Sequence, residues 1–165
     1  MAAADDFVLD GGCVCGAVRY RMTARPLFVH CCHCRWCQRE TGSAFVLNAL
    51  IESEQVELLK GRVEAVSVPS ESGRSQEICR CPTCQVALWS HYSGAGKAIR
   101  FIRAGTLDDP KQVPPDVHIY TDSKQPWVIL PDGVPAFAEY YRARETWPAE
   151  SLARARAAKE RAQSL

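Results

Sequence analysis

Short segments of alternating or continuous apolar residues recur along the chain and predict β-strands. Residues 17–22 alternate apolar and polar side chains, as in a half-buried strand, whereas 43–51 are mostly apolar, as in a buried one. Further strands are predicted at 28–30, 56–60, 63–68, 87–92, 99–104 and 117–120. Turns that contain glycine or proline separate them, at 11–16, 69–75 and 105–110. The pattern predicts a mainly β domain of the sandwich or barrel type.

Two segments have the composition of helices. Residues 35–40 predict one or two helical turns, with Gly42 placed as a C-terminal stop. Residues 151–163 are rich in Ala, Arg, Lys and Glu and follow Pro148, which favours a short C-terminal helix. We therefore expect an N-terminal tail over residues 1–10, one domain over 11–145 and a helical tail over 146–165.

Composition narrows the class of protein. A chain of 165 residues fits one domain that can bury a core. A net charge of +1 argues against a protein that coats nucleic acid or an anionic membrane, and no apolar run approaches the roughly 20 residues that span a bilayer. Residues 1–6 lack the basic and apolar segments of a secretory signal. We expect a cytoplasmic protein with no nucleic-acid or membrane partner; nothing in the sequence indicates its oligomeric state.

The cysteines are the most informative residues. Eight of the nine fall in three clusters, and the ninth is Cys79. The clusters are Cys13 with Cys15, then Cys31, Cys32, Cys34 and Cys37, then Cys81 with Cys84. In a reducing compartment, thiols spaced C-x-C or C-x-x-C are typical zinc ligands, since soft thiolates suit Zn²⁺. A disulfide-stapled secreted domain is the alternative.

The clusters divide into four ligands plus three. Structural zinc is closed by four ligands, and catalytic zinc keeps one position open. Cys32, Cys34 and Cys37 could form a three-thiolate site by themselves, which leaves the early pair to join the mid-chain pair. Three thiolates leave a local charge of −1 and a vacant position, whereas four leave −2 and a poor Lewis acid. Spacing does not prove this pairing. Two structural sites remain an alternative, with Cys31 or His33 as a fourth ligand of the second.

The ordered set of motifs resembles a known family, the glutathione-dependent formaldehyde-activating enzymes, grouped with the centromere protein V domain. The resemblance runs from Gly11 to about Phe137. Its motifs are Gly12-Cys13-x-Cys15-Gly16-x-Val18-x-Tyr20, Cys32-His33-Cys34-x-x-Cys37, Thr41-Gly42-Ser43, Cys81-x-x-Cys84, Gly105-x-Leu107-Asp108-Asp109-Pro110, and His118-Ile119-Tyr120 followed by Ser123-Lys124-x-Pro126-Trp127. One departure is Gln85, which stands where the family usually has glycine.

The resemblance implies a fold, a metal content and an activity. The fold would be a single zinc-bound, β-sandwich or tent-like domain of many short strands. Each chain would hold two zinc ions, a structural one on Cys13, Cys15, Cys81 and Cys84 and a catalytic one on Cys32, Cys34 and Cys37. The namesake activity is the reversible joining of formaldehyde and glutathione into S-hydroxymethylglutathione, a carbon–sulfur lyase reaction.

Three functions therefore compete. The first is a zinc-dependent carbon–sulfur lyase or synthase acting on a thiol–aldehyde adduct, with glutathione as the candidate thiol. The second is a non-catalytic zinc module that binds a protein or another partner. The third is a reductase or redox sensor that uses Cys31 or Cys79 as a reactive thiol. Among the histidines, His33 is expected to position its neighbours at most. His91 and His118 are expected to be satisfied core or surface residues, with a catalytic role as the alternative.

Overall fold

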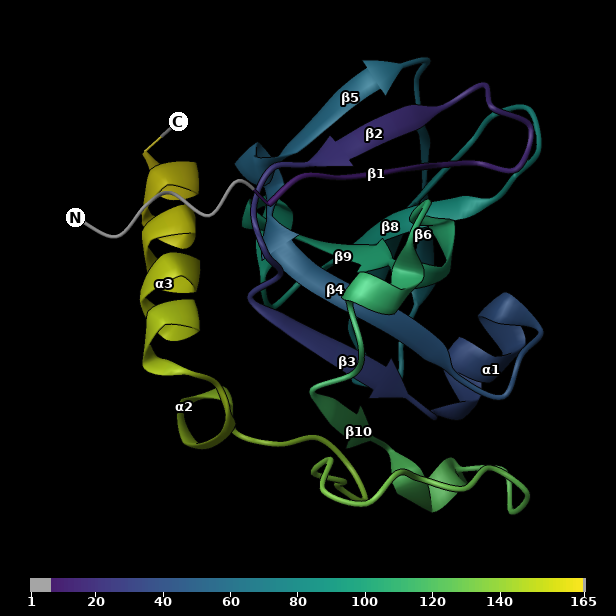
Figure 1. The fold of residues 1–165 in the computed structure, drawn as a ribbon, viewed down its shortest axis with the longest axis vertical. Helices are drawn as coiled ribbons and strands as arrows, with labels where there is room; N and C mark the ends of the chain where they lie inside the picture. The colour runs from purple at the N-terminus through teal and green to yellow at the C-terminus, as the bar shows by residue number, and fades with distance from the viewer. Residues whose placement is uncertain (1–6, 165) are drawn as a thin grey trace.

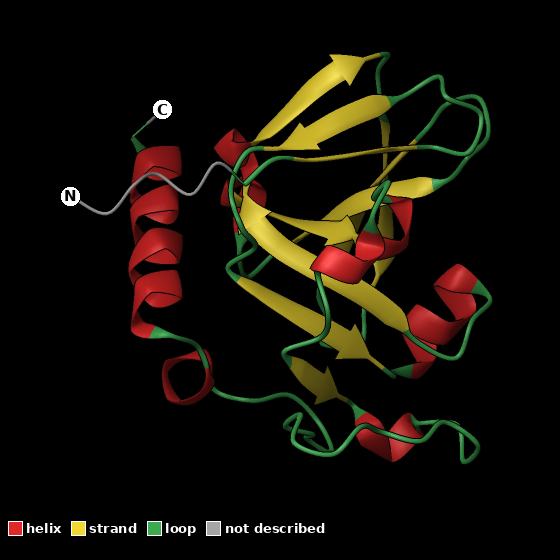
Figure 2. Ribbon diagram, in the orientation of Figure 1, coloured by secondary structure: helices red, strands yellow, loops and turns green. Residues whose placement is uncertain are grey.

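Two β-sheets of unequal size form the body of the protein (Figure 2). The computed structural model describes residues 7–164, so the N-terminal residues used to exclude a secretory signal lie outside the described residues. The small sheet has the strand order β1-β2-β5, and the large sheet has the order β10-β3-β4-β9-β8-β7-β6. All pairs are antiparallel except β10 with β3.

The strands, in chain order, are β1 Leu9–Gly12, β2 Arg19–Met22, β3 Phe28–Cys32, β4 Val46–Glu52, β5 Val56–Lys60, β6 Glu64–Pro69, β7 Ser75–Arg80, β8 Ala87–Tyr92, β9 Ile99–Arg103 and β10 Val117–Ile119. The helices are α1 Arg35–Thr41, α2 Ala143–Thr146 and α3 Ala149–Gln163. The expected fold class is confirmed: the protein is mainly β, with two sheets and a short C-terminal helix. None of the helices in residues 7–164 is both long and apolar enough to cross a bilayer.

The main core contains side chains from both sheets. Tyr20 and Met22 of β2 are fully buried together with Ile51 of β4 and Ile102 of β9. The ring of Tyr20 meets the ring of Trp89 on β8 edge to face, with centroids 5.7 Å apart. Such a contact orients the small sheet on the large one as well as burying apolar area.

The two longer helices lie at opposite ends of β4 (Figure 1). Helix α1 precedes β4 and ends at Gly42, whose left-handed conformation (φ 65°) confirms the predicted stop. At the other end, the guanidinium of Arg154 on α3 donates two hydrogen bonds of 2.8 Å to the buried carboxylate of Glu52. Because Glu52 is almost inaccessible to water, this bidentate pair fixes where α3 docks.

Most predicted strands are present, and β5 and β8 match their predicted residues at both ends. The turn predicted at 11–16 is wrong in its first two residues, because Gly11 and Gly12 belong to β1 and pair with Tyr20 and Arg19. A Cβ on Gly11 would lie 2.6 Å from the Tyr20 ring. These glycines therefore serve the close packing of a strand rather than a turn.

Two strands were not predicted at all. The two glycines of β1 suggested a turn, so its strand was not recognised. β7 was hidden by polar residues, because Gln76 is buried although it is hydrophilic. A strand whose buried positions carry polar side chains breaks the alternation on which the prediction depends.

A glycine in the turn after β5 provides a test of the packing between β5 and the start of β2. Gly61 has φ +77°, and a Cβ there would lie 2.1 Å from the carbonyl oxygen of Ala17. We predict that Gly61→Ala lowers the free energy of unfolding by about 2 kcal/mol or more, because both the backbone and its neighbour must shift. The matched control is Gly105→Ala, where nothing lies within 4 Å of the added carbon. Denaturant unfolding should show the control within about 0.5 kcal/mol of wild type. Equal losses in the two variants would contradict the prediction.

Candidate metal centres and pocket

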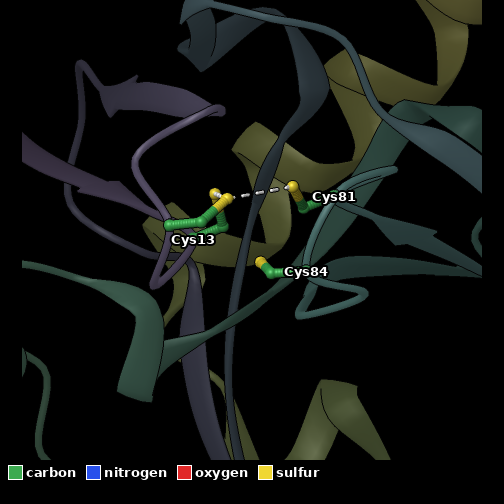
Figure 3. Close-up of side chains that lie close together, drawn as sticks. Cys13, Cys81 and Cys84 are labelled. Carbon is green, nitrogen blue, oxygen red and sulfur yellow. Dashed lines mark hydrogen bonds between the residues drawn. The ribbon is translucent and has the colours of Figure 1, made fainter.

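The first group of thiols joins two turns that are far apart in the sequence. Cys13 and Cys15 lie in the turn between β1 and β2, and Cys81 and Cys84 lie in the turn between β7 and β8. Their ligand atoms all lie within 4.8 Å of one another, and Figure 3 shows the labelled side chains pointing toward a common centre. The Sγ atoms of Cys13 and Cys15 are 3.5 Å apart, and those of Cys15 and Cys81 are 3.8 Å apart.

These distances suit a metal and not a disulfide. All nine cysteines are free, and a disulfide would need sulfurs about 2.05 Å apart. A tetrahedral zinc ion with Zn–S bonds of about 2.3 Å keeps its sulfurs about 3.8 Å apart. The four sulfurs therefore already have the spacing of such a site.

The backbone around this group favours thiolates. Burial opposes ionisation of Cys13, but the N–H of Val18, 3.3 Å from its Sγ, and the neighbouring thiols outweigh it and lower the pKa of this thiol to about 6. In the second turn, Gln85 adopts φ 62° and donates its N–H to the carbonyl of Cys81. That left-handed conformation gives a physical reason for the glycine usual at this position.

The second group of thiols is Cys32, Cys34 and Cys37. Cys32 ends β3, Cys34 is the N-cap of α1 and accepts a hydrogen bond from the N–H of Cys37, and all three are buried. Their ligand atoms also lie within 4.8 Å of one another. Hydrogen bonds from the Cys32 and Cys37 thiols lower the pKa of Cys34 to about 3. One negative charge is thus already stabilised in this group.

Neither residue considered as a fourth ligand joins the second group. Cys31 points to the other face of β3, and its Sγ lies 3.6 Å from Nε2 of His33. The same Nε2 lies 3.0 Å from Nδ1 of His118, so these three buried residues form a group of their own. Burial lowers the pKa of both imidazoles, that of His33 to about 4. The structure therefore separates Cys31 and His33 from the three thiols.

The environments of His91 and of the two extra cysteines, Cys31 and Cys79, do not favour reactivity. His91 interacts through Nδ1 with the carbonyl of Ile99 and lies near Glu77 and Cys79. Both extra cysteines are buried, and burial raises their thiol pKa, that of Cys31 to about 12. A redox function needs an accessible thiol of low pKa, which neither residue offers.

The three thiols of the second group line a pocket of about 360 Å³. Aromatic side chains form much of its wall, namely Trp36, Tyr92, Phe101, Tyr120 and Tyr140. Arg74 and Glu71 also line it, and both are exposed. The first group of four thiols does not line this pocket. Of the two groups, only the three-thiol group thus contributes to this pocket.

Sequence analysis gave no role to two polar residues of this pocket, His30 and Asn48. Both are buried, and Asn48 interrupts the apolar run of β4. A signal for each was present. His30 stands two residues before Cys32 and so shares its face of a strand, and a polar residue inside a buried strand needs a partner or a function.

This chain is similar to a known protein family and to individual known proteins. A sequence model of the glutathione-dependent formaldehyde-activating enzyme family matches residues 8–123. A Halomonas elongata protein named "putative glutathione-dependent formaldehyde-activating enzyme" is 23% identical over 156 residues, which cover 88% of this chain and 92% of that protein. A crystal structure of a Rhodobacter sphaeroides protein aligns with a TM-score of 0.45 at 15% identity, covering 62% of this chain and 93% of the other.

The family match extends over well more than half of the chain and includes all seven cysteines of the two thiol groups. The chain therefore belongs to the glutathione-dependent formaldehyde-activating enzyme family.

Proposed function

We propose that this protein is a zinc-dependent carbon–sulfur lyase or synthase that reversibly joins an aldehyde and a small thiol. One observation carries the proposal. Three buried thiols line a pocket, and the two residues that could have closed their site are turned into a different group. A site with three protein ligands beside a cavity is typical of catalytic rather than structural zinc.

Two zinc ions per chain fit the donor chemistry. The structural ion would be held by Cys13, Cys15, Cys81 and Cys84, whose sulfur spacing matches a tetrahedral site. The catalytic ion would be held by Cys32, Cys34 and Cys37. When bound there, zinc would supply a Lewis acid that favours the thiolate form of a thiol or polarises a carbonyl oxygen.

The residues of the pocket would orient the two reactants. In the reaction, the thiol sulfur bonds to the carbonyl carbon and the thiol proton ends on the carbonyl oxygen; breakdown is the reverse. The aromatic wall excludes water, and Arg74 and Glu71 offer opposite charges to a zwitterionic thiol. Glutathione, which the family name indicates, carries carboxylates and an ammonium group and is our candidate thiol, with formaldehyde as candidate aldehyde. Positioning alone can supply much of the acceleration, because thiols and aldehydes combine unaided.

The catalytic assignment predicts a specific zinc count. Cys34→Ser should lower zinc from two ions to one per folded chain and abolish acceleration of adduct formation, because two thiolates do not retain the second ion. Cys31→Ser is the matched control, since its side chain faces His33 and not the three thiols; it should keep both ions. Elemental analysis and NMR exchange measurements of adduct formation check both points. A single zinc ion in wild type, or an unchanged rate in Cys34→Ser, would favour a non-catalytic zinc module.

The structural assignment predicts where zinc stabilises the fold. Cys81→Ser should reduce the free energy of unfolding by several kcal/mol, because structural zinc binding is itself folding free energy. Cys79→Ser is the control, two residues earlier on β7 and also buried but outside the four-thiol group; we expect a loss of about 1 kcal/mol. Unfolding with and without a chelator measures both. The assignment fails if the two variants lose the same amount or if chelator leaves wild-type stability unchanged.

A further inference from the structure

Two buried polar side chains lie side by side in the wall of the pocket. His30 on β3 and Asn48 on β4 are direct cross-strand partners and are only 2% and 3% exposed. Both line the pocket, and Cys32 follows two residues after His30 on the same face of β3. Any hydrogen-bonding atom that they leave free is therefore available to a molecule bound beside the three thiols.

The orientation of the Asn48 amide is fixed by an arginine. Nη1 of Arg103, the cross-strand partner of Asn48 on β9, donates a hydrogen bond to Oδ1 of Asn48. A guanidinium group can only donate, so the oxygen of the amide must face Arg103 and the nitrogen must face away from it. Within residues 7–164, Nδ2 of Asn48 has no hydrogen-bond partner and is not enclosed. Its N–H groups are left for the pocket.

Two linked hydrogen bonds bear on the tautomer of His30. Nε1 of Trp147 donates a 2.6 Å hydrogen bond to the hydroxyl of Tyr141, and that hydroxyl also contacts Nε2 of His30. An indole N–H can only donate, so the single proton of Tyr141 is free to point to His30. The opposite assignment would require that proton to turn away from His30 toward Tyr140, the other side chain that interacts with this hydroxyl. We assign the Tyr141 proton to the short contact with Nε2, so that the neutral ring carries its own proton on Nδ1.

The Nδ1 atom also lacks a partner. Within the described chain it makes no hydrogen bond, and it is not among the fully enclosed atoms. The rings of Phe101 and Tyr140 meet the His30 ring edge to face, with centroids 6.4 and 5.8 Å away, and hold it in place. His30 is thus a rigid donor in a wall that largely excludes water, a setting in which a hydrogen bond gains strength.

We propose that Nδ1–H of His30 and Nδ2–H of Asn48 together bind the oxygen of the reacting aldehyde. The inference rests on the proposed function and deepens it: the substrate adduct must carry an oxygen on the carbon bonded to sulfur. As the thiol sulfur bonds to that carbon, the carbonyl electron pair moves onto the oxygen. The two N–H groups stabilise this negative charge until the thiol proton reaches it. Preorganised donors aimed at a developing oxyanion are among the largest contributions to catalysis.

A spectroscopic experiment tests the tautomer without turnover. In zinc-loaded protein with ¹⁵N-labelled histidine, we expect His30 to show a protonated Nδ1 and an unprotonated Nε2. Tyr141→Phe removes the donor to Nε2 and should give a mixture of tautomers. A saturating thiol–aldehyde mixture should shift the Nδ1–H signal of wild type, and a thioether of the same thiol, with no oxygen on that carbon, should not. A protonated Nε2 in wild type, or equal effects of the two ligands, would overturn the proposal.

Kinetics of matched variants test the use of the two donors. Asn48→Asp keeps an acceptor for Arg103 but loses the N–H groups, and we expect kcat/KM to fall at least about 10-fold with two zinc ions retained. His30→Asn places an amide N–H near the position of Nδ1, whereas His30→Gln places it near Nε2; the Asn variant should be the more active.

Full activity in both Asn48→Asp and His30→Gln would refute the two-donor site while leaving the lyase function intact. A wild type that accelerates no thiol–aldehyde pair would instead refute the proposed function. The ligand-induced shift of His30 then still decides whether the donors bind an oxygen.

Discussion

The approach of two distant turns is the constraint on which the rest of the molecule depends. Four sulfurs, from residues 13–15 and 81–84, converge between the turn of the small sheet and a turn of the large one. Folding must close a loop of more than sixty residues to bring them together, and this closure costs chain entropy. Once it is made, β2 is held over β8, and the Tyr20–Trp89 contact and the fully buried Met22 follow. The second thiol group is not needed for this closure and lies in a different part of the large sheet.

The alternation of side chains along the strands of the large sheet determines which residues face the pocket. A row of cross-strand partners runs from Val117 through His30 and Asn48 to Arg103, over β10, β3, β4 and β9. Cys32 stands one pleat further along β3 and on the same face, so the hydrogen-bonding row and the thiols open into the same cavity. Arg103 ends the row and is itself anchored by Glu40 of α1, the helix that carries Cys37. The three thiols and the polar residues of the pocket thus share one rigid framework.

Much of this was accessible from the sequence because its strongest signals are local. The spacing of the cysteines identified both thiol groups, and the alternation of residues 17–22 and 87–92 located two strands. What escaped prediction was set by contacts distant in sequence. β1 was missed because Gly11 packs against the ring of Tyr20, and β7 because the buried Gln76 lines the pocket. His30 could be placed on a strand, but its contact with Tyr141, more than a hundred residues later, could not be read from local spacing.

The contact between Tyr141 and His30 joins the part of the chain that the family model matches to the segment that follows it. The family model ends at residue 123, whereas Tyr140, Tyr141 and Trp147 all lie in the segment beyond it. The matched part of the chain therefore supplies the candidate metal ligands and the histidine, and the C-terminal segment adds Tyr140 to the wall of the cavity and the hydroxyl that contacts Nε2 of that histidine. A change confined to this terminal segment would therefore alter the cavity wall and the contacts of that histidine while leaving all seven cysteines of the two thiol groups in place.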